Sequence, residues 1–330
     1  MSVFLQGLAL TLPAAVERLS DGAALAAAAE GFETFGVAGA EEGLALMVRA
    51  VEAACRDAGV DPEAVDDLIC LRNLTDERLD GAWLSVAIGA QLGFPGRCMD
   101  LRACACAGFA HGVDVAARLV AGGGRAIVVG GGASGFRRRW LDHEAEFDTP
   151  PPESLADVPV LLGDGAYAAV VGAEAGRYRV LASAVALDTS FADAHVVIDG
   201  ETRPRCVDDK RRWRDTAPVQ FARALQTAAQ AAGRTLRPAT LIGTNCGVST
   251  KQRLFTALAT DAPEPHRREA LAAQLQQMRE IGHLFGGDMV ANLLASERAG
   301  AIRPGDTIVG VEFGEMYFTS VLALEAEARR

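Results

Sequence analysis

The stretch DLRACACAGF, residues 100–109, places two closely spaced cysteines at the beginning of a helical pattern. Apolar residues recur at three- and four-residue spacing from Phe109 to Val120, so Cys106 is predicted to lie at a helix start. Free backbone N–H groups and the positive end of the helix dipole favour a thiolate there. The alternative is a small buried apolar residue, which describes most free cysteines. Cys104 competes with Cys106 as the candidate nucleophile.

The composition is that of a globular protein. The chain has 330 residues, half of them hydrophobic, and a net charge of −11. An acidic balance argues against nucleic acid or an anionic membrane as a partner, since both select an excess of Lys and Arg. No apolar run reaches the roughly eighteen residues of a membrane helix, and the N-terminal segment lacks the basic start of a signal peptide. We therefore expect a cytoplasmic protein.

The seven cysteines include no CxxC pair and no cluster with histidine. This spacing predicts neither a disulfide framework nor a metal site.

The predicted elements of the first half recur in the second half. Corresponding elements lie about 170 to 180 residues apart, which is the mark of an internal duplication. The pattern predicts two similar α/β halves, residues 1–173 and 174–330. The matched elements are the helices 43–58 and 219–232, the strands 67–71 and 240–244, and the strands 125–131 and 306–314. Within the first half, an Asp-Gly turn in residues 160–171 predicts a β-hairpin.

The duplication also predicts a partner for Cys106. Advancing by the repeat length leads to EIGHLFGGDM, residues 280–289, at the start of the matching helix. A pseudo-two-fold axis brings the two helix starts together, so that His283 serves Cys106 as a base near neutral pH. Asp288 follows across two glycines and is placed to fix the second ring nitrogen. Taken singly, a core histidine and a helix N-cap are the simpler interpretations, but convergence on Cys106 favours a catalytic site.

These segments resemble the thiolase superfamily and, within it, β-ketoacyl-ACP synthase III. The resemblance rests on CAGF at 106–109, GDGA at 163–166 and the segment 302–314, and it spans essentially the whole chain. It implies a thiolase fold whose duplicated halves form a five-layered αβαβα core. It further implies a homodimer without a bound cofactor that uses acyl-carrier-protein or acyl-CoA thioesters. An oxyanion hole is implied at the Cys106 N–H and the loop that contains Gly314 and Glu315.

The sequence departs from the condensing members of the family at two positions. Thr244 and Asn245 stand where those members have the histidine of an HQAN-like motif, and His283 stands where they have the asparagine of a GN motif. The missing pair stabilises the enolate that decarboxylation leaves, so its loss disfavours carbon–carbon bond formation. Thr244 and Asn245 remain candidate auxiliary residues. The Cys and GHxxxxD arrangement is similar to that of synthase-III-like acyltransferases from natural-product pathways.

The predicted reaction is a ping-pong acyl transfer. Cys106 takes the acyl group from the thioester, and His283, oriented by Asp288, then activates the hydroxyl or amine of a small-molecule acceptor. Two alternatives stay open. The first is a condensing enzyme that uses His283 with Thr244 or Asn245, and the second is a non-catalytic subunit of a hetero-oligomeric synthase, which the retained Cys106 disfavours.

A basic cluster interrupts the acidic sequence shortly after the middle of the chain. A solvated charged face is the simplest interpretation of such a run. The alternative is a docking site for an acidic carrier protein or for the phosphates of CoA. The residues of this basic cluster are Arg211, Arg212, Trp213 and Arg214.

Overall fold

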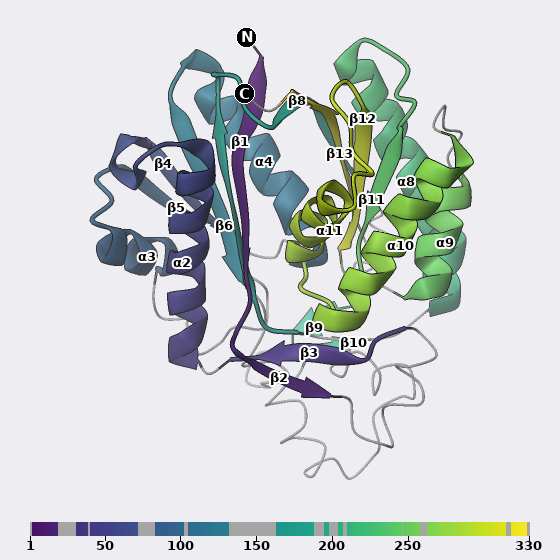
Figure 1. Ribbon diagram of the computed structural model, residues 1–330, viewed down its shortest axis with the longest axis horizontal. Helices are drawn as coiled ribbons and strands as arrows, with labels where there is room; N and C mark the ends of the chain where they lie inside the picture. Colours follow the sequence, from purple (N-terminus) through teal and green to yellow (C-terminus); the bar gives the residue numbers. More distant parts are fainter. Residues whose placement is uncertain are drawn as a thin grey trace.

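The structure is a computed structural model of the whole chain. It describes residues 2–18, 31–38, 40–71, 83–101, 105–131, 163–187, 195–197, 204–206, 210–245, 247–257, 263–314 and 318–328. Figure 1 shows alternating layers of helices and strands, with two helices enclosed in the middle.

The central sheet has the strand order β11-β12-β13-β8-β1-β7-β6-β4-β5. Apart from the additional edge strand β5, this order is symmetric about the antiparallel contact between β1 and β8. On the β1 side, β7 is antiparallel to β6, and β6 is parallel to β4. On the β8 side, β13 is antiparallel to β12, and β12 is parallel to β11. The strands β1, β7, β6 and β4 thus correspond in order to β8, β13, β12 and β11, and residues 173/174 fall in the connection between β7 and β8. The division of the chain into halves at this point stays a prediction. The strands are β1 (Val3–Thr11), β4 (Asp67–Leu71), β5 (Arg97–Leu101), β6 (Arg125–Gly131), β7 (Ala166–Gly172), β8 (Tyr178–Leu187), β11 (Thr240–Gly243), β12 (Thr307–Gly314) and β13 (Phe318–Ala326).

The helices form three layers around the two halves of the sheet. Helices α4 (Gly108–Leu119) and α11 (Gly287–Arg298) are in the middle, since each contacts strands of both halves. Helices α2 (Ala40–Ala58) and α3 (Leu84–Leu92) cover the first half from outside. The second half is covered by α8 (Lys210–Ala232), α9 (Val248–Ala257) and α10 (Glu264–Ile281). The layers give the predicted αβαβα order (Figure 1).

Shorter elements connect these layers. Two small hairpin-like pairs lie apart from the central sheet: β2 (Ala15–Arg18) with β3 (Thr34–Val37), and β9 (His195–Val197) with β10 (Pro204–Cys206). Single 3₁₀ turns are η1 (Pro62–Ala64), η3 (Ala105–Ala107) and η4 (Val120–Gly122). Among the described helices, none has both the length and the hydrophobicity that crossing a membrane requires.

The core follows from the alternation of side chains along each strand. In β6, Val128 faces the middle helices, whereas Ile127 and Val129 face α2. In β12, Ile308 faces the middle helices, whereas Val309 faces α8. A strand with helices on both faces buries every residue, which explains the continuous apolar runs in the sequence.

Two expectations about local structure were wrong. The hairpin predicted at 160–171 is wrong for β7, because β1 and β6 occupy both of its edges. Residues 160–162 lie outside the described part of the chain. Helix α8 begins at Lys210 instead of residue 219 and runs through Pro218. Proline normally ends a helix because it lacks an N–H donor, but Pro218 lies on the exposed side of α8.

Candidate active site

Cys106 lies in the single turn η3 immediately before α4, as predicted. The first N–H groups of α4 have no partner within the helix, as in every α-helix. Ala107, the N-cap residue, has no side chain that could accept from them. The positive end of the α4 dipole therefore lies beside the sulfur and favours its anionic form. Just before this turn, Asp100 on β5 accepts hydrogen bonds from the N–H and the hydroxyl of Ser85, which fixes β5 to the first turn of α3.

His283 lies in the short connection between α10 and α11. The N–H of Gly163 in the GDGA segment donates to the carbonyl oxygen of His283 at 3.0 Å, so the first half of the chain holds this connection in place. A Cβ atom on Gly163 would lie 2.2 Å from the carbonyl oxygen of Ile281. A Cβ atom on Gly286 would lie 2.9 Å from the backbone nitrogen of Phe109 in α4. Both contacts need glycine, and they allow the starts of α4 and α11 to approach closely.

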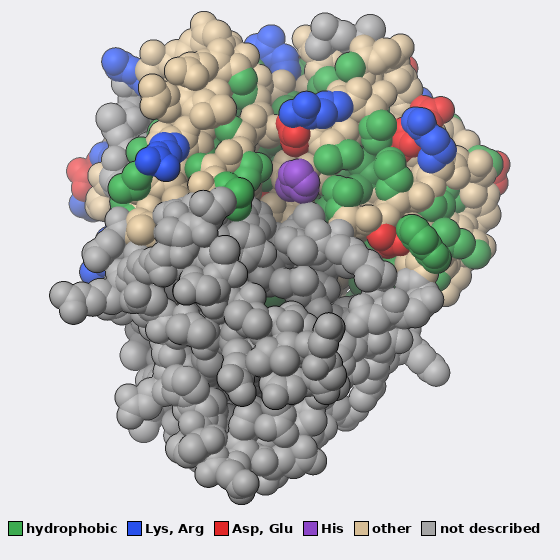
Figure 2. Space-filling view, turned by 180° about the vertical axis from the view of Figure 1, so that it is seen from behind, with side chains coloured by type: hydrophobic (Ala, Val, Ile, Leu, Met, Phe, Trp, Pro, Cys, Tyr) green, Lys and Arg blue, Asp and Glu red, His purple; other side chains and the backbone are tan. Residues whose placement is uncertain are grey.

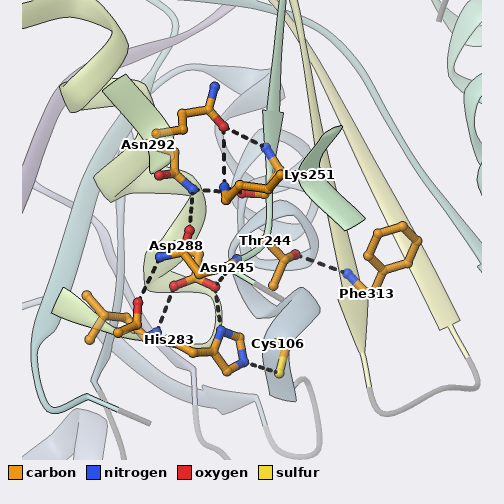
Figure 3. A network of polar contacts seen from close by, with 12 residues as sticks. Cys106, Thr244, Asn245, Lys251, His283, Asp288, Asn292 and Phe313 are labelled. Atoms are coloured by element: carbon orange, nitrogen blue, oxygen red, sulfur yellow. Dashed lines mark hydrogen bonds and ion pairs between the residues drawn. The ribbon is translucent and has the colours of Figure 1, made fainter. Parts of the chain in front are cut away.

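The structure brings the three predicted catalytic residues into one row (Figure 3). The Sγ atom of Cys106 lies 3.0 Å from Nε2 of His283, 177 positions away in the sequence. Nδ1 of His283 lies 2.5 Å from Oδ2 of Asp288. The carboxylate is fully buried, and the imidazole is 12% exposed. The geometry is that of a nucleophile, a base and an orienting carboxylate, and the catalytic role of the three residues stays a prediction.

The charges around His283 favour its protonated form. Burial alone lowers the pKa of His283, but the negative charges of Asp288 and Cys106 outweigh it and raise this pKa well above its ordinary value. A protonated imidazole donates Nδ1–H to Asp288 and Nε2–H to a Cys106 thiolate. An imidazolium that faces a thiolate is the reactive form of a catalytic cysteine, and this is the form that we expect at rest.

Asp288 is held in place by two backbone donors in addition to His283. Its Oδ1 accepts from the N–H of Leu284 at 2.7 Å, and its Oδ2 accepts from the N–H of Asn245 at 2.7 Å. The side-chain amide of Asn245 in turn donates to the carbonyl oxygen of Gly282 at 2.8 Å. Hydrogen bonds to an ionised carboxylate are short and strong, so these contacts fix the orientation that His283 needs.

Sequence reasoning missed a second set of polar residues behind Asp288 (Figure 3). The amide of Asn292 donates to Asn245 Oδ1 at 3.0 Å and to the carbonyl oxygen of Gly243 at 2.7 Å. That carbonyl oxygen also accepts from Nζ of the fully buried Lys251 at 2.9 Å. Asn292 had a detectable signal, because it follows Asp288 by one helical turn and lies on the same helix face. Lys251 had none, since its burial depends on α10.

The structure gives Thr244 and Asn245 supporting contacts. Both are buried. The hydroxyl of Thr244 donates to the carbonyl oxygen of Val311 at 3.3 Å, and accepts from the N–H of Phe313 at 3.4 Å. These contacts connect the end of β11 with β12, and those of Asn245 hold the His283 connection. The auxiliary role toward substrate that the resemblance implied for both residues stays a prediction.

The remaining predicted positions are described only in part. Gly314 is the last residue of β12, whereas Glu315 and Cys104 lie outside the described residues. The basic cluster Arg211, Arg212, Trp213 and Arg214 belongs to the first turns of α8, and the structure describes its backbone but not its side chains. In the described part of the chain, no three His, Cys, Asp or Glu side chains are grouped so that they could hold a metal ion.

Two comparisons with known sequences find similar proteins. The sequence model of the family described as 3-oxoacyl-[acyl-carrier-protein] synthase III matches residues 99–189, which include Cys106 and the GDGA segment. The β-ketoacyl-[acyl-carrier-protein] synthase III of Cereibacter sphaeroides is 27% identical over 281 residues, which are 82% of this chain and 79% of the relative.

Solved structures share the fold over nearly the whole length. 3-Oxoacyl-(acyl carrier protein) synthase III of Pseudomonas aeruginosa superposes with a TM-score of 0.77 at 21% identity, covering 100% of both chains. The acyltransferase ChlB3 has a TM-score of 0.76 at 20% identity, with 99% of this chain and 98% of that chain covered. A Xanthomonas campestris OleA variant with bound lauric acid and lauroyl-CoA has a TM-score of 0.76 at 17% identity, with 98% and 99% covered. The chain thus has the thiolase fold of these proteins and is similar in sequence to β-ketoacyl-ACP synthase III.

Proposed function

We propose that this protein is an acyltransferase that moves an acyl group from an acyl-carrier-protein or CoA thioester to a hydroxyl or amine acceptor. The observation that carries the proposal is the row Cys106–His283–Asp288, in which the sulfur lies 3.0 Å from a base that a buried carboxylate orients. The structural likeness to the acyltransferase ChlB3 supports this function. The reaction belongs, in this proposal, to natural-product biosynthesis.

The first half of the reaction loads Cys106. Its thiolate attacks the carbonyl carbon of the donor thioester, and the negative charge moves to the carbonyl oxygen. The N–H of Cys106 and the loop that begins at Gly314 are the proposed oxyanion donors. When the tetrahedral intermediate collapses, the bond to the carrier sulfur breaks, and that sulfur takes the Nε2 proton of His283. The products are a thioester on Cys106, a free carrier thiol and a neutral imidazole.

The second half transfers the acyl group. Neutral His283 accepts the proton of the acceptor O–H or N–H as the acceptor oxygen or nitrogen attacks the Cys106 thioester. The carbon–sulfur bond breaks, and the thiolate returns opposite a protonated His283. Asp288 keeps the ring in one tautomer through both halves and stabilises the imidazolium. Protons and electrons balance without a cofactor or a metal ion.

A condensing reaction is the alternative, since the named relatives are synthase III proteins. Such a reaction needs two side-chain donors that meet at the thioester carbonyl of the extender unit. Thr244 and the amide of Asn245 both make hydrogen bonds to backbone carbonyl oxygens instead. This arrangement favours acyl transfer over condensation. The non-catalytic alternative is disfavoured by the intact row of Cys106, His283 and Asp288.

Mass spectrometry of the intact protein tests the proposal. We expect incubation with a panel of acyl-CoA and acyl-carrier thioesters to add the mass of one acyl group, and addition of hydroxyl or amine acceptors to remove it as an ester or amide. In parallel, malonyl thioesters are offered and carbon dioxide is measured. Malonyl-dependent release of carbon dioxide with a lengthened acyl product would establish condensation instead. Absence of any mass gain across the panel would favour the non-catalytic alternative.

We also propose that the protein is a homodimer that joins at β5. In the described part of the chain β5 pairs only with β4, so its outer edge is open, and open edges are normally paired or covered. Next to it, Trp83 and Val86 of α3 are 69% and 52% exposed. Figure 2 shows hydrophobic side chains gathered in several groups on the side behind the view of Figure 1.

Sedimentation equilibrium tests the homodimer. We expect twice the chain mass of 34.5 kDa for the native protein. The variant Val86→Glu, which adds a charge beside the open edge, should shift the protein toward the mass of one chain. The matched control Val219→Glu changes a similarly exposed valine on α8 and should stay dimeric. A native protein that sediments as a single chain at micromolar concentration would contradict the proposal.

A further inference from the structure

Strand β12 carries a carboxyl group, Glu312, into the interior beside the start of α4. Its neighbours Val311 and Phe313 face the cluster under α8. Ile308 and Gly310 face the middle layer, where Gly310 lies against Met289 of α11. Glu312 belongs to the same face as these two residues and is fully buried. The mechanism above does not use it.

Glu312 holds the first turn of the helix that follows Cys106. Its Oε2 accepts from the N–H of Ala110 at 2.9 Å, one of the N–H groups that the helix itself leaves free. Ser320, the partner of Glu312 across β12 and β13, has its Oγ 3.3 Å from the same Oε2 and 3.5 Å from the carbonyl oxygen of Ala107. Glu312 and Ser320 thus connect the start of α4 to two strands. Within the described residues, Oε1 of Glu312 has no hydrogen-bond partner.

The surroundings favour a neutral Glu312. Burial, the largest effect, and the charge of Asp288 raise the pKa of Glu312 well above its ordinary value, although the Ala110 N–H, Ser320 and His283 lower it. Ser320 donates its hydroxyl hydrogen to Oε2 or to the Ala107 carbonyl oxygen, and Oε2 also accepts from the Ala110 N–H. An ionised Glu312 keeps these contacts. It also adds a negative charge at the N-terminal end of α4. The positive potential of this helix end, which stabilises the Cys106 thiolate, is thereby reduced.

We propose that Glu312 is a positioning residue that clamps the first turn of α4 to β12 and β13 and so keeps Cys106 opposite His283. The inference deepens the proposed function, and it rests on Cys106 being the nucleophile of that function. A neutral Glu312 matters for two reasons. It must accept from the buried N–H of Ala110, and it must not add a second negative charge at the helix start, whose positive potential stabilises the Cys106 thiolate. Glutamic acid meets both conditions, whereas a carboxylate meets only the first.

The rate at which iodoacetamide alkylates Cys106, measured against pH and located by peptide mass, tests the inference without any acyl donor. Glu312→Gln keeps, in a neutral group of the same shape, the oxygen that accepts from the Ala110 N–H and from Ser320. We therefore expect the alkylation rate to stay within about twofold of native and its pH midpoint to stay within about a few tenths of a unit. Glu312→Ala leaves the Ala110 N–H buried without an acceptor and frees the turn, so we expect alkylation to slow about tenfold or more. Asp67→Asn, a buried carboxyl group on β4, is the matched control and should change neither quantity.

Three results would overturn the inference. A Glu312→Gln variant as slow as Glu312→Ala would show that a carboxylate is required, and a lower pH midpoint in Glu312→Gln would show that Glu312 is ionised in the native protein. A Glu312→Ala variant that reacts like native would show that no clamp exists. Circular dichroism shows whether Glu312→Ala folds. If it does not, two other measurements decide: the pH midpoint of Glu312→Gln and the alkylation rate of Ser320→Ala. We expect the rate of Ser320→Ala to fall about threefold. Failure of the proposed function is separate, since it appears as a missing mass gain with acyl donors while this alkylation pattern persists.

Discussion

Replacement of Cys106 by alanine is expected to abolish the acyl-enzyme and to lower acyl transfer by about 10⁴-fold or more, to the rate that binding and the oxyanion donors alone support. The substitution removes the only sulfur that lies within 3.0 Å of His283 in the described part of the structure. The fold should persist, because the side chain is small and only partly buried. Mass spectrometry of the intact protein after incubation with an accepted thioester, alongside a turnover assay, measures both effects.

The control for this change is Cys98→Ala. Cys98 is another partly buried free cysteine, on β5, and it packs against Gly89 of α3 away from His283. This variant should form the acyl-enzyme and turn over like the native chain. A mass gain that survives in Cys106→Ala and maps to Cys104 would contradict the assignment, because Cys104 is the competing nucleophile in the same segment.

The meeting of Cys106 with His283 was predictable because a duplicated chain repeats its topology. The N-terminal ends of α4 and α11 occupy equivalent places in the two halves. Cys106 and His283, which lie at equivalent positions of the sequence repeat, are therefore close together in space. The middle layer was expected from the resemblance to the thiolase fold, and in the structure α4 and α11 each contact strands of both halves. The duplication thus predicted that Cys106 and His283 lie close together, whereas the layers followed from the resemblance.

Other features depend on contacts that the sequence does not encode locally. Glu312 reads as one polar residue in a strand, and only the sheet order with α4 above it reveals a buried carboxyl group. Lys251 is buried because Gln274 of α10 and the end of β11 surround its amine. The hairpin at 160–171 failed for the same reason: a turn signal cannot show that β1 and β6 already fill both edges of β7. Long-range packing overrode local propensity in each case.

Asp288→Asn is expected to lower turnover about 10³- to 10⁴-fold while leaving the fold intact. The amide has the shape of the carboxylate but can present N–H to Nδ1 of His283, which selects the wrong tautomer. The change also removes a charge that raises the pKa of His283. In the native site the raised pKa of His283 favours a protonated imidazole beside Cys106. Without Asp288 the ion pair is weaker, so the thiolate forms only at higher pH.

The measured consequence is an upward shift in the pH midpoint of Cys106 alkylation, together with the loss of turnover. Glu297→Gln is the matched control, because Glu297 lies on the same helix and binds Tyr178 and Arg177 at the end remote from His283. It should lower thermal stability without moving the midpoint. The N-cap of α11 is Gly286, so the simpler interpretation of Asp288 as the N-cap was wrong. A purely structural Asp288, which only holds the N–H groups of Leu284 and Asn245, predicts a loss of stability with an unchanged midpoint. An Asp288→Asn variant that behaves like Glu297→Gln would therefore establish the structural role, since a shifted midpoint requires that the Asp288 charge acts on His283.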